Sequence, residues 1–164
     1  MATLEKIEFA KLDSCRFIGK SVYAPPFSEE LGAVWCNSET VFEAVDKLKE
    51  YATDEIHNVA LLTGNEQDNL MRYTIGRFMK ADTPVPEGLD FIDIPETFIA
   101  KGWIKGKFED MVQNADTLTS EAAKKQDKYE LTGKFAAEVY TEETIPEDGV
   151  SSVLGYYIAC EEMK

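Results

Sequence analysis

The sequence predicts an α+β fold made of two tandem β-α-β-β units, with antiparallel sheets, two helices and a cleft between the repeats. The first observation is a repeated phrase, FIGKSVY at residues 17–23 and FIAKGWI at residues 98–104, which are 81 residues apart. The second is the pair of segments MRYTIGR and LGYYIAC, which places Tyr73 against Tyr156 at a spacing of 83 residues. The third is DTPVPEG at residues 82–88, a break rich in proline and glycine.

The length of the chain suits a single domain over residues 1–164. Within it we expect two repeats, at about residues 12–82 and about residues 89–162. Two copies are too few for a solenoid or a propeller, and the spacing between them is too long.

The first half begins with a β-rich segment at residues 14–25, which ends at a proline pair because proline cannot donate to a sheet ladder. A helix capped by Asn37 or Ser38 is expected next, since apolar residues follow at helical spacing. These are Val41, Phe42, Val45 and Leu48. Strands at residues 58–63 and 70–81 then flank the turn-forming segment GNEQDN and predict a hairpin.

The second half repeats this order of elements. A strand-rich segment at residues 89–105 is followed by a helix that begins near Phe108. The expected buried stripe of this helix is Phe108, Met111, Val112, Ala115 and Leu118. A polar connection at residues 125–134 leads to two further strands, at residues 135–141 and 150–161.

Each repeated phrase has two sides, because alternate residues of a strand share a face. We expect one side to pack against a helix, since small and large apolar residues alternate on it. That side comprises Phe17, Gly19, Ser21 and Tyr23 in the first half and Phe98, Ala100, Gly102 and Ile104 in the second. Trp103 lies on the other side and is predicted to point away from the helix, either toward the groove or into an ordinary core.

The composition excludes several classes of protein. The chain carries 31 acidic against 17 basic residues, a formal net charge of −14, without the basic cluster of a nucleic-acid-binding protein. We therefore expect no direct nucleic-acid binding and a preference for cations. Neither a membrane-spanning apolar run nor a signal peptide is recognised, so a cytoplasmic protein is expected. Three cysteines without a CxxC spacing, beside one histidine, predict neither disulfides nor a metal site.

Glu138 is the sharpest candidate for a functional residue, because it lies in FAAEVY, a segment that is otherwise small, apolar or aromatic. Burying a carboxylate is costly unless a partner compensates, so either Glu138 faces solvent or it meets a cationic or hydrogen-bonding ligand. Aromatic residues on neighbouring segments would complete a site for a lipophilic cation by cation–π contact. They are Tyr140, Tyr73, Trp103, Tyr156, Tyr157 and Trp35.

The sequence lacks the motifs of other functional classes. It contains no glycine-rich phosphate loop and no GxSxG nucleophile turn, and no cofactor is predicted. His57 follows the first helix, where an exposed position at the helix end is the simpler interpretation.

Several of these segments resemble the GyrI-like small-molecule-binding domain family, which includes the effector-binding domains of multidrug-sensing transcription regulators and the DNA gyrase inhibitory protein. The segments are RYTIG, ETFIAKG and EVYTEE, and the resemblance covers about residues 15–160. It implies a cleft between the repeats for bulky lipophilic cations, with a central glutamate and aromatic walls. Glu138, Tyr140 and Tyr73 are the positions that match. Gly155 departs from the family, since it occupies the place of an acidic residue in the last strand.

Three functions are compatible with this resemblance. The first is a free-standing protein that captures or senses lipophilic cations. The second is a hydrolase of reactive cyclopropane-containing compounds, with Glu138 as general acid or base. The third is a protein whose partner is another protein, with gyrase inhibition as the family precedent. A haem-binding role, with His57 as the axial ligand, is the least favoured.

Overall fold

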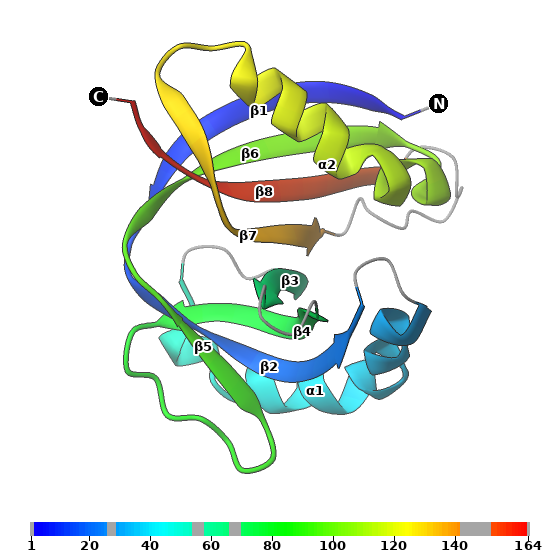
Figure 1. The fold of residues 1–164 in the computed structure, drawn as a ribbon. Helices are drawn as coiled ribbons and strands as arrows, with labels where there is room; N and C mark the ends of the chain where they lie inside the picture. Colours follow the sequence, from blue (N-terminus) through cyan, green and yellow to red (C-terminus); the bar gives the residue numbers. More distant parts are fainter. Residues whose placement is uncertain (1, 26–28, 54–57, 66–69, 142–151, 164) are drawn as a thin grey trace. The chain divides into compact units, whose positions relative to one another are not determined.

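The computed structural model describes residues 2–25, 29–53, 58–65, 70–141 and 152–163, which belong to two compact units. Unit 1 comprises Met1–Leu12 and Thr97–Lys164, and unit 2 comprises Asp13–Glu96. In its described part, each unit is an antiparallel sheet with one α-helix (Figure 1). This confirms the α+β class, the antiparallel pairing and the two helices, whereas the duplication itself stays a prediction.

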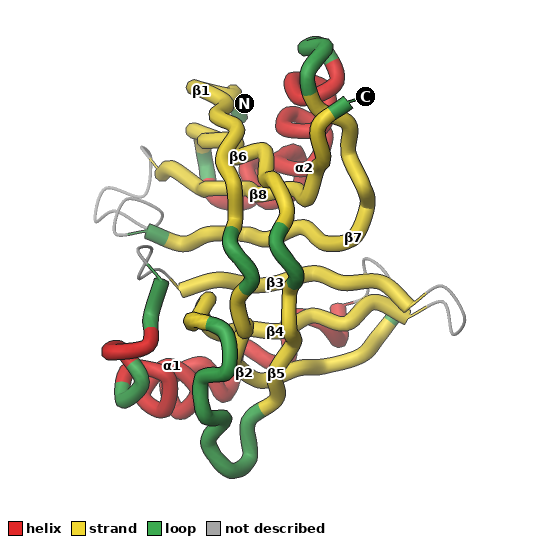
Figure 2. Tube along the Cα trace, turned by 90° about the vertical axis from the view of Figure 1, so that its left-hand side faces the viewer, coloured by secondary structure: helices red, strands yellow, loops and turns green. Residues whose placement is uncertain are grey.

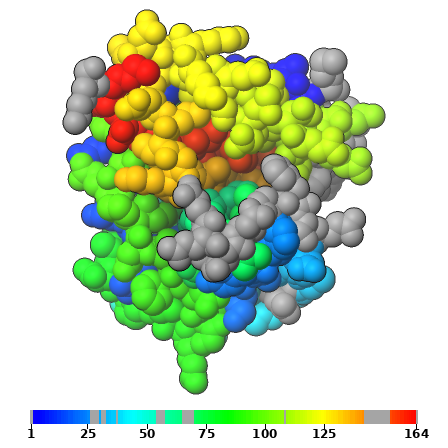
Figure 3. All heavy atoms as spheres, in the orientation of Figure 1, coloured from blue at the N-terminus to red at the C-terminus, as the bar shows by residue number. Residues whose placement is uncertain are grey.

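Unit 1 has the strand order β1-β6-β8-β7, and every neighbouring pair is antiparallel. Its elements are β1 (Thr3–Leu12), β6 (Thr97–Gly106), α2 (Phe108–Lys124), β7 (Tyr129–Tyr140) and β8 (Ser152–Glu162). The helix α2 covers one face of this sheet, as the tube in Figure 2 shows. In the space-filling view its yellow-green side chains lie over the red strand β8 (Figure 3).

The core of unit 1 forms between α2 and the side of the sheet that carries Gly102 and Ile104. Ile104 packs in one cluster with Met111 and Ala115 of the helix. A side chain at Gly102 would place its Cβ 2.4 Å from Oγ1 of Thr119, so glycine lets the helix approach β6 closely. The helix side predicted for the second half is therefore the observed one.

The buried stripe of α2 differs from the predicted one at one position. Val112 is 40% exposed, whereas Met111, Ala115 and Thr119 are fully buried. These three residues form an i, i+4 row along the helix, and that row faces the sheet. The prediction for Val112 is wrong. Gly102 has no side chain, so the row of Met111, Ala115 and Thr119 can pack closely on the sheet. The side chain of Phe108 lies outside the described set.

Unit 2 has the strand order β3-β4-β2-β5, again with antiparallel neighbours. Its elements are β2 (Cys15–Ala24), the 3-10 helix η1 (Glu29–Asn37), α1 (Ser38–Asp46), the 3-10 turn η2 (Lys49–Tyr51), β3 (Asn58–Asn65), β4 (Leu70–Lys80) and β5 (Asp90–Ile94). Ile18, Val45 and Met79 form the core beneath α1. The predicted hairpin of β3 and β4 is present.

The helix side predicted for β2 is wrong. Ile18 packs against Val45 of α1, so Phe17 and the residues in phase with it point away from this helix. The cross-strand partner of Tyr73 is Val22, and that of Tyr156 is Gly102. Aligning the two tyrosines thus shifts the first strands by one residue from the register of the repeated phrase. A shift of one residue turns every side chain of a strand to the other face.

The segment at residues 89–105 is divided between the two units. Residues 90–94 form β5, which pairs with β2 of unit 2, and β6 begins at Thr97 and pairs with β1 and β8 of unit 1. Arg16 on β2 donates a hydrogen bond to Asp93 on β5 at 2.7 Å. This hydrogen bond holds the pKa of the Asp93 carboxyl below its usual range.

Candidate functional site

Glu138 lies in β7, directly across the ladder from Tyr156 of β8. Directly opposite residues of an antiparallel pair share a face, so Glu138 is on the side of the sheet that α2 covers. Only 7% of Glu138 is exposed, between the fully buried residues Ala137 and Val139. The alternative that Glu138 faces solvent is therefore wrong, and a buried carboxylate is present on this face.

Tyr156 connects this face of the sheet to the helix. Its ring packs in the cluster of Met111 and Ala115, and its hydroxyl donates a hydrogen bond to Oδ2 of Asp116 at 2.8 Å. Tyr140, half-buried at the end of β7, packs against the same cluster. Three of the predicted site residues, Glu138, Tyr140 and Tyr156, thus lie on the α2 side of unit 1.

Asp116 is a polar residue of this face that the sequence analysis did not find. It lies on α2, where the helical pattern marks it only as one of several solvated polar positions. Its contact with Tyr156 arises because the helix crosses β8 at this point. Asp116 therefore adds a carboxylate on the α2 side of unit 1, whereas Gly155 lies on the opposite face of the sheet.

Trp103 and Tyr157 lie on the opposite face of the same sheet. The cross-strand pairs Trp103–Gly155 and Lys101–Tyr157 place all four residues on the side away from α2. The two rings meet edge to face, with centroids 6.2 Å apart. Trp103 therefore points away from the helix, as predicted, and it is half-buried. The successive tyrosines at 156 and 157 necessarily point to opposite faces.

The space beside Gly155 is filled by the indole of Trp103. A Cβ on Gly155 would lie 3.1 Å from Cζ3 of Trp103 and 3.1 Å from Cβ of Val139. Lys6 lies over the indole at 5.7 Å from the ring centroid, and Lys101 lies over the ring of Tyr157 at 5.0 Å. Aromatic rings and ammonium groups therefore alternate on this face.

Trp35 and Tyr73 belong to unit 2 and contact each other. Nε1 of Trp35 donates a hydrogen bond to the Tyr73 hydroxyl at 2.9 Å. Tyr73 is 7% exposed, and it shares the face of β4 that Met79 presents to α1. The indole of Trp35 also lies 6.2 Å from the ring of Phe42 of α1. This pair is an aromatic contact on the helix side of unit 2.

The predicted site residues thus fall into three groups on two units. Glu138, Tyr140 and Tyr156 form one group, Trp103 and Tyr157 a second, and Trp35 and Tyr73 a third. The first two lie on opposite faces of one sheet. A cleft between the repeats stays a prediction.

Two cysteine thiols are too protected to act as nucleophiles. Burial raises the pKa of Cys15 to about 11 and that of Cys160 to about 11. The reactive form of cysteine is the thiolate, so both side chains are inert thiols at neutral pH. His57 lies outside the described residues. In the part of the chain that the structure describes, no group of three or more His, Cys, Asp and Glu side chains is placed to hold a metal ion.

The family model for the integron-associated effector binding protein, Cass2, matches residues 8–160. The chain belongs to this family. The match confirms the resemblance to the effector-binding domains of transcription regulators. No curated protein matches the sequence at a significant level.

Several solved structures share the fold. SAV2435 bound to tetraphenylphosphonium gives a TM-score of 0.69 at 13% identity, covering 95% of this chain and 94% of that chain. A bacterial transcription regulation protein from Staphylococcus aureus MU50 gives 0.66 at 14% identity, covering 95% of this chain and 98% of that chain. The C-terminal domain of EcmrR gives 0.65 at 14% identity, covering 96% and 98%. At these identities the likeness shows the fold alone.

Among the described residues, no helix of this effector-binding protein combines the length and the apolar character that crossing a membrane requires.

Proposed function

We propose that this effector-binding protein captures lipophilic cations on the α2 side of unit 1, with Glu138 as the counter-charge. The observation that carries the proposal is the burial of this carboxylate in β7, directly across from the ring of Tyr156. Tyr140 and Tyr156 supply aromatic contacts, and Asp116 supplies a second negative charge at the edge of the face. The tetraphenylphosphonium bound to SAV2435, a structure of the same fold, is a ligand of this chemical class.

The physical basis is the burial of Glu138, because opposite charges attract more strongly away from water. Two opposite charges about 4 Å apart attract by about 1 kcal/mol in water, but by about 4 kcal/mol at an effective dielectric constant of about 20. A cation whose charge is spread over apolar groups loses little hydration when it leaves water. Such a cation therefore gains this attraction at a low cost of desolvation, whereas a small hydrated cation does not. Contact with tyrosine rings adds a cation–π term of about 0.5–1 kcal/mol or more.

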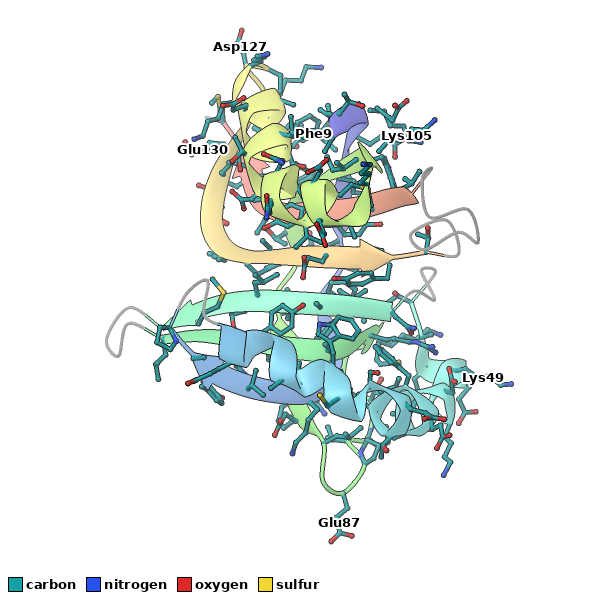
Figure 4. All side chains as sticks on the ribbon, turned by 90° about the vertical axis from the view of Figure 1, so that its right-hand side faces the viewer. Phe9, Lys49, Glu87, Lys105, Asp127 and Glu130 are labelled. Atoms are coloured by element: carbon teal, nitrogen blue, oxygen red, sulfur yellow. The ribbon has the colours of Figure 1, made fainter. Side chains whose placement is uncertain are left out.

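The experiment is a calorimetric titration of the full chain with tetraphenylphosphonium, and with tetraphenylborate as the anion of matched shape. We expect Glu138→Gln to weaken tetraphenylphosphonium binding at least about tenfold, which corresponds to about 1.4 kcal/mol. Glu130→Gln is the control, because Glu130 lies on the same strand, is exposed and is far from Tyr156 in the register (Figure 4). Trp35→Phe in the same assay tests the predicted participation of unit 2.

Two results would contradict the proposal. One is an unchanged affinity for tetraphenylphosphonium in Glu138→Gln. The other is equal affinity for tetraphenylborate, because a site built on a buried carboxylate disfavours an anion.

Hydrolysis is the second candidate function, and one contact favours it. Tyr156 lies directly across from Glu138 and donates a hydrogen bond to Asp116, so a phenol and a second carboxylate contact each other on this face. Positioned groups of these types can transfer protons in general acid–base catalysis. The test is turnover of a cyclopropane-containing substrate beyond one equivalent per chain, with loss of that turnover in Glu138→Gln. Release of a single equivalent or less would exclude catalysis.

A further inference from the structure

A pocket of about 480 Å³ opens on the face of the unit 1 sheet that points away from α2. Its lining residues are Glu5, Lys6, Trp103, Lys105 and Val153, all from unit 1. Ligand pockets for small molecules have volumes of about 300–1,000 Å³, so this one is large enough for a small aromatic molecule. Trp103 and Glu138 lie on opposite faces of the sheet, and therefore the pocket is separate from the proposed cation site.

Two backbone features build this pocket. The first is a break in the register of β1 between Leu4 and Lys6, opposite the end of β6. A bulge at such a place bends the strand and redirects side chains, as bulges beside functional sites do. The second is Gly155, which has no side chain to displace the Trp103 indole from its place over β8. As a result, the indole of Trp103 lines an open space.

The surroundings of this pocket carry a small excess of basic side chains, in contrast to the acidic chain as a whole. Lys6 and Lys105 line it beside Glu5, and Lys6 also forms an ion pair with Glu8 at 3.1 Å, although the chain has a formal net charge of −14. Lys101, two residues from Trp103, points to the same face. The local concentration of ammonium groups favours an anion here. Figure 4 shows Lys105 beside β1, away from the helix α2.

The indole itself has an unused donor. Nε1 of Trp103 is buried and has no hydrogen-bond partner in the described structure. A buried donor without an acceptor is energetically unfavourable, and an oxygen atom of a ligand would satisfy it. Lys6 lies over the ring and pairs with Glu8, but both side chains are more than half exposed, so this ion pair can open to admit such an oxygen. The residues that line this pocket thus include an aromatic ring with an indole N–H and two side chains with ammonium groups.

We propose that this pocket binds a small aromatic carboxylate. The aromatic ring packs on the indole of Trp103, and the carboxylate lies between Lys6 and Lys105 with one oxygen accepting the hydrogen bond of Nε1. Arranged in this way, the two faces of one sheet serve ligands of opposite charge. The site does not depend on Glu138, so its existence is independent of the proposed cation binding.

The test follows the indole N–H signals of the ¹⁵N-labelled full chain by NMR during titration with 2-naphthoate. The chain has two tryptophans, and the Trp35→Phe variant assigns the remaining signal to Trp103. The matched probe of opposite charge is 2-naphthylmethylammonium. We expect naphthoate to move the Trp103 signal downfield to saturation, because its N–H gains an acceptor. The ammonium probe should bind at least about tenfold more weakly at this signal.

Two sets of variants sharpen the result. Lys6→Gln with Lys105→Gln should weaken naphthoate binding at least about tenfold, whereas Lys128→Gln with Lys134→Gln removes two exposed charges elsewhere in unit 1 and should change nothing. Glu138→Gln should leave naphthoate binding intact while it weakens binding of tetraphenylphosphonium. This contrast separates a failure of this pocket from a failure of the cation site.

Three results would overturn the proposal. They are a Trp103 signal that does not respond to naphthoate, an equal response to the ammonium probe, and unchanged naphthoate affinity in the variant without Lys6 and Lys105.

Discussion

The two faces of the unit 1 sheet differ in charge and in how tightly they are packed. The face beneath α2 carries Glu138 and Tyr156, and its helix contributes Asp116. The other face carries Trp103 between lysines and is open at its end. Because side chains alternate along a strand, consecutive residues of β6 and β8 contribute to both environments. Residues that are adjacent in the sequence therefore point to different faces and need not contact the same ligand.

Glycine has a different role on each face. On the helix face Gly102 lies against Thr119, whose Cβ, Cγ2 and Oγ1 would all be within 3.1 Å of an added Cβ. On the open face an added Cβ at Gly155 would lie 3.1 Å from the edge of the Trp103 ring and 3.1 Å from Cβ of Val139. The first contact involves a short branched side chain held by a helix, and the second a ring beside open space. The helix face should therefore tolerate change less well.

The largest effect is expected for Gly102→Ala. The added methyl group cannot be accommodated by rotation of Thr119, because both branches of that side chain are too close, so α2 has to move. We expect a loss of about 2–3 kcal/mol in the free energy of unfolding, measured by urea denaturation. Weaker binding of tetraphenylphosphonium should accompany it, since the helix also positions Asp116.

A double-mutant cycle tests the cause of this loss. Thr119→Ala removes the two nearest atoms, so Gly102→Ala should cost less than about 1 kcal/mol in that background. An equal cost in both backgrounds would show that the contact with the helix is not responsible.

A smaller effect is expected for Asp116→Asn. Asparagine keeps an acceptor for the Tyr156 hydroxyl but removes the charge, and the exposed position of Asp116 weakens its attraction for a cation. We expect the affinity for tetraphenylphosphonium to fall about fivefold, or about 1 kcal/mol, by calorimetry. Glu109→Gln, which changes an exposed carboxylate on the same helix, should leave the affinity unchanged. If the two variants behave alike, Asp116 has no particular role.

The smallest change in stability is expected for Gly155→Ala. Replacing glycine in a strand gains about 0.5–1 kcal/mol of backbone entropy, and this gain offsets the displacement of the indole. The free energy of unfolding should therefore stay within about 0.5 kcal/mol of the parent value. The signal of the Trp103 indole should nevertheless shift, and naphthoate should bind more weakly. An unperturbed indole signal would contradict the contact between the ring and Gly155.

Much of the fold could be predicted because most strands follow the alternation of their own apolar residues. The strand β1 could not, since its apolar residues Leu4, Ile7 and Phe9 are spaced by three and then by two positions. The irregular register between Leu4 and Lys6 accounts for this spacing, because a bulge adds a residue without changing the face. The face of β2 that packs on the helix was also not predictable, because a repeated phrase carries no information about the register in which a strand pairs.

A site residue could be predicted only where its polarity differs from that of its neighbours in the sequence. Glu138 stands out among small and apolar neighbours, and it is buried in the structure. Asp116 does not stand out, because an aspartate on the polar side of a helix is ordinary and its contact with Tyr156 depends on where α2 crosses the sheet. Trp103 and Tyr157 were grouped with Glu138 because they are aromatic, although the pleat directs them elsewhere.

The chain of unit 1 is interrupted by the whole of unit 2. Leu12, at the end of β1, pairs with Thr97, at the start of β6. The first strand therefore cannot pair until residues much later in the chain have been synthesised. Translation adds about 5–20 residues per second, which leaves this strand without its partner on the ribosome for several seconds. Unit 2 is continuous from Asp13 to Glu96 and can fold during that interval. We expect a nascent chain stopped after Glu96 to hold a folded unit 2 and an unpaired leading strand that is open to aggregation.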